Sequence, residues 1–149
     1  MRFLFVDEIV ELAPGRSITA IKKVNEDEDY FQDHFPGFPV VPGVLLVEMM
    51  AQTAGKCLDA EKRPRGKAML AQISAAKFRS WVQPGVTARV QAVIKSNQER
   101  YATAHCRVEV DNLEVSTADL FFTFVPIGNF SPSYRDAVLE NHMAARASD

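Results

Sequence analysis

The chain has 149 residues, of which 47% are hydrophobic and 24% charged, and its net charge is −2 at pH 7. This length suffices for one well-cored domain, and the near-neutral charge lacks the basic field expected of a nucleic-acid-binding protein. No run is long and apolar enough for a membrane span or a secretory signal, and the two isolated cysteines favour a reducing compartment, so we expect a cytoplasmic protein.

The first half of the chain predicts two strands and one helix. The apolar run at residues 3–6 predicts a short buried strand, and residues 17–24 alternate loosely after the turn signal Pro14-Gly15. Residues 43–58 are nearly continuously apolar, contain no proline and begin just after Pro42, which favours a helix. Because this helix is apolar nearly all round, we expect it to be buried.

The second half of the chain is strand-like. Residues 68–74 and 77–82 predict two strand segments, and three longer segments alternate between apolar and polar residues, with a hairpin turn at Asp111-Asn112. These longer segments are residues 86–95, 101–110 and 113–125. Long antiparallel strands with one apolar face each need another element to bury that face. The predicted helix at 43–58 is the only long apolar helix available. The sequence therefore predicts an α+β fold in which one antiparallel sheet wraps around one long central helix.

The pattern breaks after Pro126, so we expect a domain at residues 1–127 and a C-terminal tail at 128–149. Residues 133–146 are compatible with a short amphipathic helix and equally with a frayed tail, and the sequence leaves both open.

Chemistry is suggested by the segment from His34 to Gly43, which has the sequence HFPGFPVVPG. Its prolines and glycines fix a tightly turned path that ends at the helix start. Such a path holds His34 in one place and presents the free amides of Gly43 and Val44 at the positive end of the helix. These amides are suited to stabilise the enolate-like oxygen that develops when a proton leaves the carbon beside a thioester carbonyl.

A polar stripe runs along the otherwise apolar helix. It consists of Glu48, Gln52 and Lys56, spaced four residues apart. A carboxyl in apolar surroundings suits a general acid, and an imidazole suits a general base that removes a carbon-bound proton. His34 and Glu48 are therefore the candidate catalytic pair, whereas His105 on a polar strand face and His142 in the tail are not candidates.

The run HFPGFPVVPGVLLVEMMAQTAG resembles the motif of the (3R)-3-hydroxyacyl-[acyl-carrier-protein] dehydratases of type II fatty acid synthesis, which have the hot-dog fold. The likeness extends from about residue 3 to about residue 125. It implies that His34 and Glu48 are catalytic, that the Gly43 amide binds the carbonyl and that Gln52 supports Glu48. It also implies a homodimer with sites shared between protomers, further assembly into hexamers in some members, and a phosphopantetheine-borne substrate with no metal or organic cofactor.

The sequence departs from the pattern of this family at three positions. Ser74 and Val86 stand where relatives often carry acidic residues, and Trp81 stands where proline is common. These departures bear on substrate range more than on the reaction. The carboxyl is Glu48, where the related dehydratase-isomerases typically have Asp, which favours dehydration without isomerisation. For the acyl tunnel we expect apolar lining residues, namely Phe35, Met49, Met50 and Trp81.

Basic residues gather between the helix and the second half of the chain. A dock for an acidic carrier protein would use Arg63, Arg65, Lys77 and Arg79, although such a cluster is also typical of a solvated loop. Three alternatives stay open, one of which is a specialised dehydratase of a polyketide or pigment pathway. A hot-dog thioesterase would use Glu48 to activate water but gives no reason for His34, and a non-catalytic acyl-binding or assembly subunit would keep the fold alone.

Overall fold

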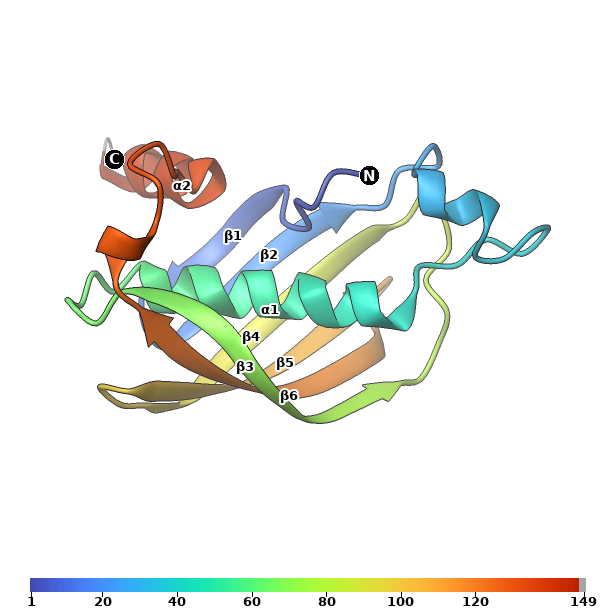
Figure 1. Cartoon of the computed structure of the whole chain (residues 1–149). Helices are drawn as coiled ribbons and strands as arrows, with labels where there is room; N and C mark the ends of the chain where they lie inside the picture. Colours follow the sequence, from blue (N-terminus) through green and yellow to red (C-terminus); the bar gives the residue numbers. More distant parts are fainter. Residues whose placement is uncertain (148–149) are drawn as a thin grey trace.

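The computed structural model describes residues 1–147 and contains a six-stranded antiparallel sheet that curves around helix α1 (Gly43–Asp59), as Figure 1 shows. The strand order is β1-β2-β4-β5-β6-β3, which leaves β1 and β3 at the two edges. The strands are β1 (Glu8–Ala13), β2 (Ser17–Lys23), β3 (Lys67–Phe78), β4 (Thr87–Asn97), β5 (Tyr101–Val110) and β6 (Leu113–Val125). This arrangement confirms the predicted α+β hot-dog fold.

The core lies between α1 and the concave face of the sheet. Met49, Met50 and Leu58 of the helix are buried against the inward face of the central strands. Many of the strand positions on this face are small, which lets the backbone of a long helix come close to the sheet. They include Ala88, Ala92, Ala102, Ala104 and Ala118.

The long strands of the second half follow the sequence prediction closely. The predicted hairpin between β5 and β6 turns at Asp111 and Asn112, whose φ angles are +52° and +66°. Two successive residues with positive φ fit the two-residue turn that matches the twist of antiparallel strands. Asn and Asp tolerate this conformation better than most residues, so the turn could be identified from sequence.

Two strand predictions were wrong. Residues 3–6 do not form a strand, since β1 begins at Glu8, although Phe5 and Val6 are buried as expected. The Phe5 amide instead donates to the side chain of Gln52 over 2.9 Å. The break predicted between residues 74 and 77 is also absent, because Ala75 and Ala76 pair with β6 and β3 is continuous. Residues 79–82 lie outside it.

The C-terminal segment folds back over the domain. After the short helix η2 (Ile127–Asn129), the chain forms α2 (Ala137–Ala147), which packs beside β1. Arg146 Nη1 donates to the Leu12 carbonyl over 2.8 Å. Of the two alternatives for this segment, the helix is the one observed. Within residues 1–147, no helix has the length and apolar character that a membrane span requires.

Candidate active site

His34 lies in a tightly closed loop that follows the short helix η1 (Asp29–Gln32). The His34 amide donates to the Tyr30 carbonyl, and the His34 carbonyl accepts from the Val40 amide, both over 3.0 Å. Inside this loop, Phe35 and Phe38 exchange two backbone hydrogen bonds of 2.9 and 2.8 Å. The proline- and glycine-rich run therefore fixes the backbone on both sides of the histidine, as its composition predicted.

The imidazole of His34 is held in one orientation. Its Nδ1 lies 3.0 Å from the Val40 carbonyl oxygen, and its ring stacks on Phe35 with centroids 3.9 Å apart. Because a carbonyl oxygen can only accept, Nδ1 carries the hydrogen of this bond. In the neutral ring the Nε2 lone pair is then left to accept a proton, which is the state that a general base needs.

The start of α1 provides free backbone donors. Pro42 is the N-cap, and its carbonyl accepts from Leu45 and Leu46. Within the described residues, no hydrogen bond is formed by the amides of Gly43 and Val44. A Cβ at Gly43 would lie 3.0 Å from the ring of Phe78, so glycine also lets the helix start approach the end of β3.

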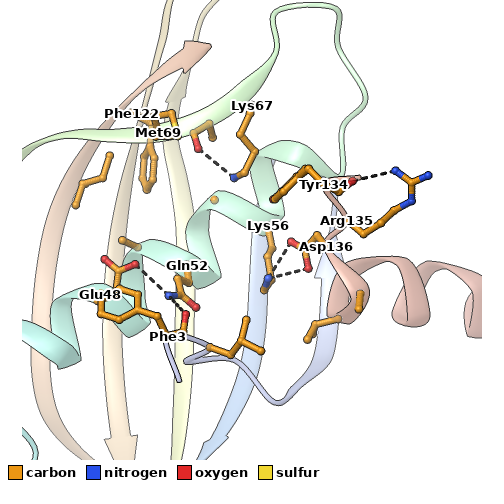
Figure 2. Close-up of a pocket in the computed structure, with 17 residues that line it drawn as sticks. Phe3, Glu48, Gln52, Lys56, Lys67, Met69, Phe122, Tyr134, Arg135 and Asp136 are labelled. Carbon is orange, nitrogen blue, oxygen red and sulfur yellow. Dashed lines mark hydrogen bonds and ion pairs between the residues drawn. The ribbon is translucent and has the colours of Figure 1, made fainter. Parts of the chain in front are cut away.

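Glu48 lies on the same helix and is oriented by Gln52. Gln52 Nε2 donates to Glu48 Oε1 over 3.0 Å and to the Phe3 carbonyl over 3.1 Å, while Gln52 Oε1 accepts the Phe5 amide. The Gln52 amide thus connects the carboxyl to the N-terminal segment, as Figure 2 shows. Gln52 is placed as expected for a residue that supports Glu48.

Glu48 and Gln52 line a cavity of about 530 Å³ between α1, β3 and the two terminal segments. Much of its wall is apolar, with side chains of Phe3, Leu4, Ala51, Ala68, Met69, Leu70 and Phe122. His34 does not line this cavity, so within one chain the Glu48 cavity contains only one of the two candidate catalytic residues.

The four residues expected to line an acyl tunnel lie elsewhere. Met49 and Met50 are fully buried in the core, whereas Phe35 and Trp81 are exposed, with Trp81 packed edge-on against Phe38. None of the four lines the Glu48 cavity.

The residues of α1 that line the cavity recur with the period of the helix. Ala51, Gln52, Gly55 and Lys56 lie three, four, seven and eight residues after Glu48, a spacing that could have identified them. The tail residues that line the cavity have no such signal, because their contacts are distant in sequence.

The basic residues predicted to dock a carrier protein do not form one cluster. Arg65 has a buried side chain that donates to Asn97 and to the Gln98 carbonyl, pairs with Glu61 and lies over the Phe124 ring. Arg63 pairs with Glu61 and Glu99. These two arginines follow the C-terminal end of α1, whereas Lys77 and Arg79 lie near its start, about 25 Å away for a helix of this length.

His105, one of the two histidines outside the candidate site, has a partner on the sheet. His105 Nδ1 lies 2.7 Å from Asp119 on the exposed face of the sheet. In residues 1–147, no three His, Cys, Asp or Glu side chains are grouped so as to hold a metal ion.

Comparisons with known proteins identify the family. The model of the FabA-like domain matches residues 1–119. A 3-hydroxyacyl-[acyl-carrier-protein] dehydratase FabZ from Lactobacillus helveticus is 38% identical over 120 residues, which cover 80% of this chain and 81% of that protein. The dehydratase FabZ of Wolbachia pipientis is 45% identical over 95 residues, or 63% of this chain and 66% of the relative.

Solved structures share the fold at lower identity. The dehydratase heterocomplex ApeI:P from Xenorhabdus doucetiae matches with a TM-score of 0.63 and 20% identity, over 79% of this chain and 97% of that one. A hypothetical thioesterase with coenzyme A from Streptococcus pneumoniae matches with a TM-score of 0.64 and 10% identity, over 80% and 85% of the two chains. Such distant likenesses show the hot-dog fold alone, whereas the sequence matches are specific. The chain therefore belongs to the 3-hydroxyacyl-[acyl-carrier-protein] dehydratase family of FabA-like proteins.

Proposed function

We propose that this protein removes water from (3R)-3-hydroxyacyl thioesters on acyl carrier protein, with His34 of one protomer and Glu48 of its partner in each active site. The dehydratase activity in fatty acid biosynthesis follows from family membership over most of the chain. The assignment of residues is our own, and it rests on one observation: Glu48 and its Gln52 support line an apolar cavity that His34 of the same chain does not reach.

A second copy is suggested by the free edge of the sheet. β3 is an edge strand of 12 residues, and every residue from Met69 to Trp81 is exposed. Its exposed side chains include the apolar Met69, Leu70, Ile73 and Phe78. A long apolar edge strand is a template for pairing with another strand. A twofold pairing of β3 with the partner's β3 buries these side chains and joins the two sheets.

The same pairing explains how the site is completed. When two copies of β3 pair antiparallel about their midpoint, the Lys67 end of one strand lies beside the Phe78 end of the other. Ala68, Met69 and Leu70 line the Glu48 cavity, whereas Phe78 packs on Gly43 near the histidine loop. The pairing therefore carries the partner's loop towards the cavity in which Glu48 lies.

In this site each residue has one role. His34 Nε2 takes the proton from C2, the C2–H electrons form the C2=C3 double bond, and the C3–O bond breaks as Glu48 gives its proton to the leaving hydroxyl. The products are a trans-2-enoyl thioester and water. The Gly43 and Val44 amides stabilise the negative charge that develops on the thioester oxygen. Transfer of the proton from His34 back to Glu48 restores the starting state.

We propose that no metal or organic cofactor takes part, since the imidazole and the carboxyl supply both proton transfers. The acyl group arrives on the phosphopantetheine arm of the carrier. Cys57 and Cys106 are free thiols in the core, and a reducing compartment, the cytoplasm, keeps such thiols unmodified.

The test is to follow hydration of a trans-2-enoyl thioester by the wild type, His34→Ala and Glu48→Gln. General acid and base roles predict losses of about 10²- to 10⁴-fold for each variant. His105→Ala is the matched control, because that imidazole is exposed and its Nδ1 pairs with Asp119 on the outer face of the sheet, so the variant should keep full activity. Release of free thiol from a saturated acyl thioester at a higher rate than hydration would instead indicate a thioesterase.

Sharing of sites is tested by mixing the two inactive variants. A mixed dimer contains one site with both substitutions and one site with neither, so activity should reappear after the subunits exchange. If the exchanged mixture stays as inactive as its parents, His34 and Glu48 do not come from different protomers.

A further inference from the structure

We infer that the C-terminal segment forms the far wall of the acyl-chain cavity and limits the length of chain that the enzyme accepts. The segment consists of Tyr134 to Val138 and lies beyond residue 119, where the match to the family model ends. This inference rests on the proposed function, because it takes the Glu48 cavity as the place where the acyl chain lies.

The cavity has two chemically different ends. Much of its wall is apolar, as an acyl chain requires, and Figure 2 shows Phe3, Met69 and Phe122 on the side of Glu48. At the other end, Lys56, Lys67, Tyr134 and Asp136 form its wall. Figure 2 shows Tyr134 and Asp136 at the end away from Glu48. From the tail, Tyr134, Arg135 and Asp136 thus contribute polar and charged groups to the cavity wall, beside the apolar Ala137 and Val138.

This wall is firmly attached to the rest of the molecule. Lys56 Nζ contacts both carboxylate oxygens of Asp136, over 2.9 and 2.8 Å, and the two side chains are only 12% and 14% exposed. Beyond this pair, Val138, Leu139 and Met143 pack against the core. A partly buried ion pair with two hydrogen bonds is costly to break on one side. The position of the wall is thus determined by the fold.

The distance from the acid to the wall gives a length. Lys56 follows Glu48 by eight residues on one helix, which corresponds to about 12 Å along its axis. An extended alkyl chain advances about 1.25 Å per carbon, given bonds of about 1.5 Å and angles near 111°. About nine or ten carbons beyond C3, where Glu48 acts, therefore span the cavity. An acyl chain of roughly 12 carbons fills it, and a longer one meets the Lys56–Asp136 pair.

The discriminating test compares acyl chains of different length on widened variants. Tyr134→Ala removes a ring from the far wall without touching Glu48, Gln52 or His34. We expect kcat/KM for a 14-carbon enoyl thioester to rise roughly tenfold relative to a 4-carbon one, since two more buried methylenes give about that factor. Val138→Ala should shift the ratio in the same direction. Asn141→Ala, an exposed change on α2, is the control and should leave it unchanged.

The outcomes separate this inference from the proposed function. If the folded wild type hydrates neither substrate, the proposed function is wrong. If the wild type is active but both widened variants keep its ratio between long and short chains, the tail does not limit chain length. Thermal melting of each variant shows that it is folded, and the ratio itself is insensitive to the fraction of active protein.

Discussion

Gln52 donates a hydrogen bond of 3.0 Å to the carboxyl of Glu48, while its two other contacts are to the backbone of Phe3 and Phe5. The side-chain amide therefore positions the Glu48 carboxyl relative to the N-terminal segment. Replacing Gln52 by Met keeps the size of the side chain but removes all three hydrogen bonds. We expect kcat for hydration to fall about tenfold with little change in KM, because Glu48 loses the donor that orients its carboxyl.

A matched substitution distinguishes positioning from loss of stability. Gln98→Met removes an exposed side-chain amide that donates a 3.5 Å hydrogen bond to Ser96 Oγ. It should change neither kcat nor KM. If Gln52→Met lowers the melting temperature but leaves kcat and KM unchanged, Gln52 is a structural residue only.

The free edge of β3 predicts the oligomeric state. Ile73 at the middle of β3 is 47% exposed, and Val93 on the central strand β4 is 45% exposed. Ile73→Arg places a charge in the proposed interface and should convert the dimer to a monomer with little activity. Val93→Arg makes the same change on a strand with two neighbours and should leave a dimer. Gel filtration with light scattering measures both, and a dimeric Ile73→Arg variant would contradict the proposed pairing.

Carrier docking is best tested at Lys77 and Arg79. Arg79 has a half-exposed side chain that pairs with Glu114, whereas Arg65 is buried and serves the fold. Reversing both charges, as Lys77→Glu and Arg79→Glu, should lower kcat/KM for carrier-bound substrate several-fold at low salt and leave a pantetheine thioester unaffected.

The control for charge reversal is Arg107→Glu on the outer face of β5, where Arg107 pairs with Glu109. It changes the net charge in the same direction but lies on another surface. Equal losses on the carrier-bound and the small substrate would show that Lys77 and Arg79 do not contribute to docking.

The buried thiols predict a loss of stability at high pH. Burial raises the pKa of Cys57 to about 11 and that of Cys106 to about 12, from an ordinary value of 9.0. Above pH 9 the unfolded chain loses protons that the folded chain keeps, so unfolding becomes more favourable as the pH rises towards 11. Below pH 9 both states hold these protons and the thiols add no pH dependence.

The measurement is the free energy of unfolding in urea between pH 8 and pH 11. It should fall more steeply for the wild type than for a variant with Cys57→Ala and Cys106→Ala. Equal slopes would show that other groups account for the alkaline loss. In the native protein at pH 8, both thiols should also react far more slowly with a thiol reagent than in urea.

The parts of the fold that the sequence could predict are those whose pattern is local. The helix at 43–58 has a continuous apolar run after a proline, and β4, β5 and β6 alternate with a turn at Asp111-Asn112 between the last two. The segment at residues 3–6 has a strand-like composition, but its backbone partner is the Gln52 side chain, 47 residues away from Phe5. No local pattern contains that contact.

The candidate site shows the same contrast between residues that share a local motif and contacts that are distant in sequence. His34, Gly43, Glu48 and Gln52 could be selected because one short motif carries them all. The far wall of the cavity could not, since the Lys56–Asp136 pair joins residues 80 positions apart. Arg65 belonged to a basic cluster in sequence, yet the fold surrounds it with Asn97, Glu61 and Phe124. Such tertiary contacts decide which charged side chains remain available to a partner.

The packing of α2 beside β1 has a consequence for assembly as a whole. With Arg146 on the Leu12 carbonyl and a register shift between Ile9 and Glu11, β1 is a poor template for an added strand. The sheet can then be extended only at β3. Pairing at a single edge closes after two copies, whereas two available edges would allow an open-ended filament. The tail thereby favours a finite particle over a growing fibre.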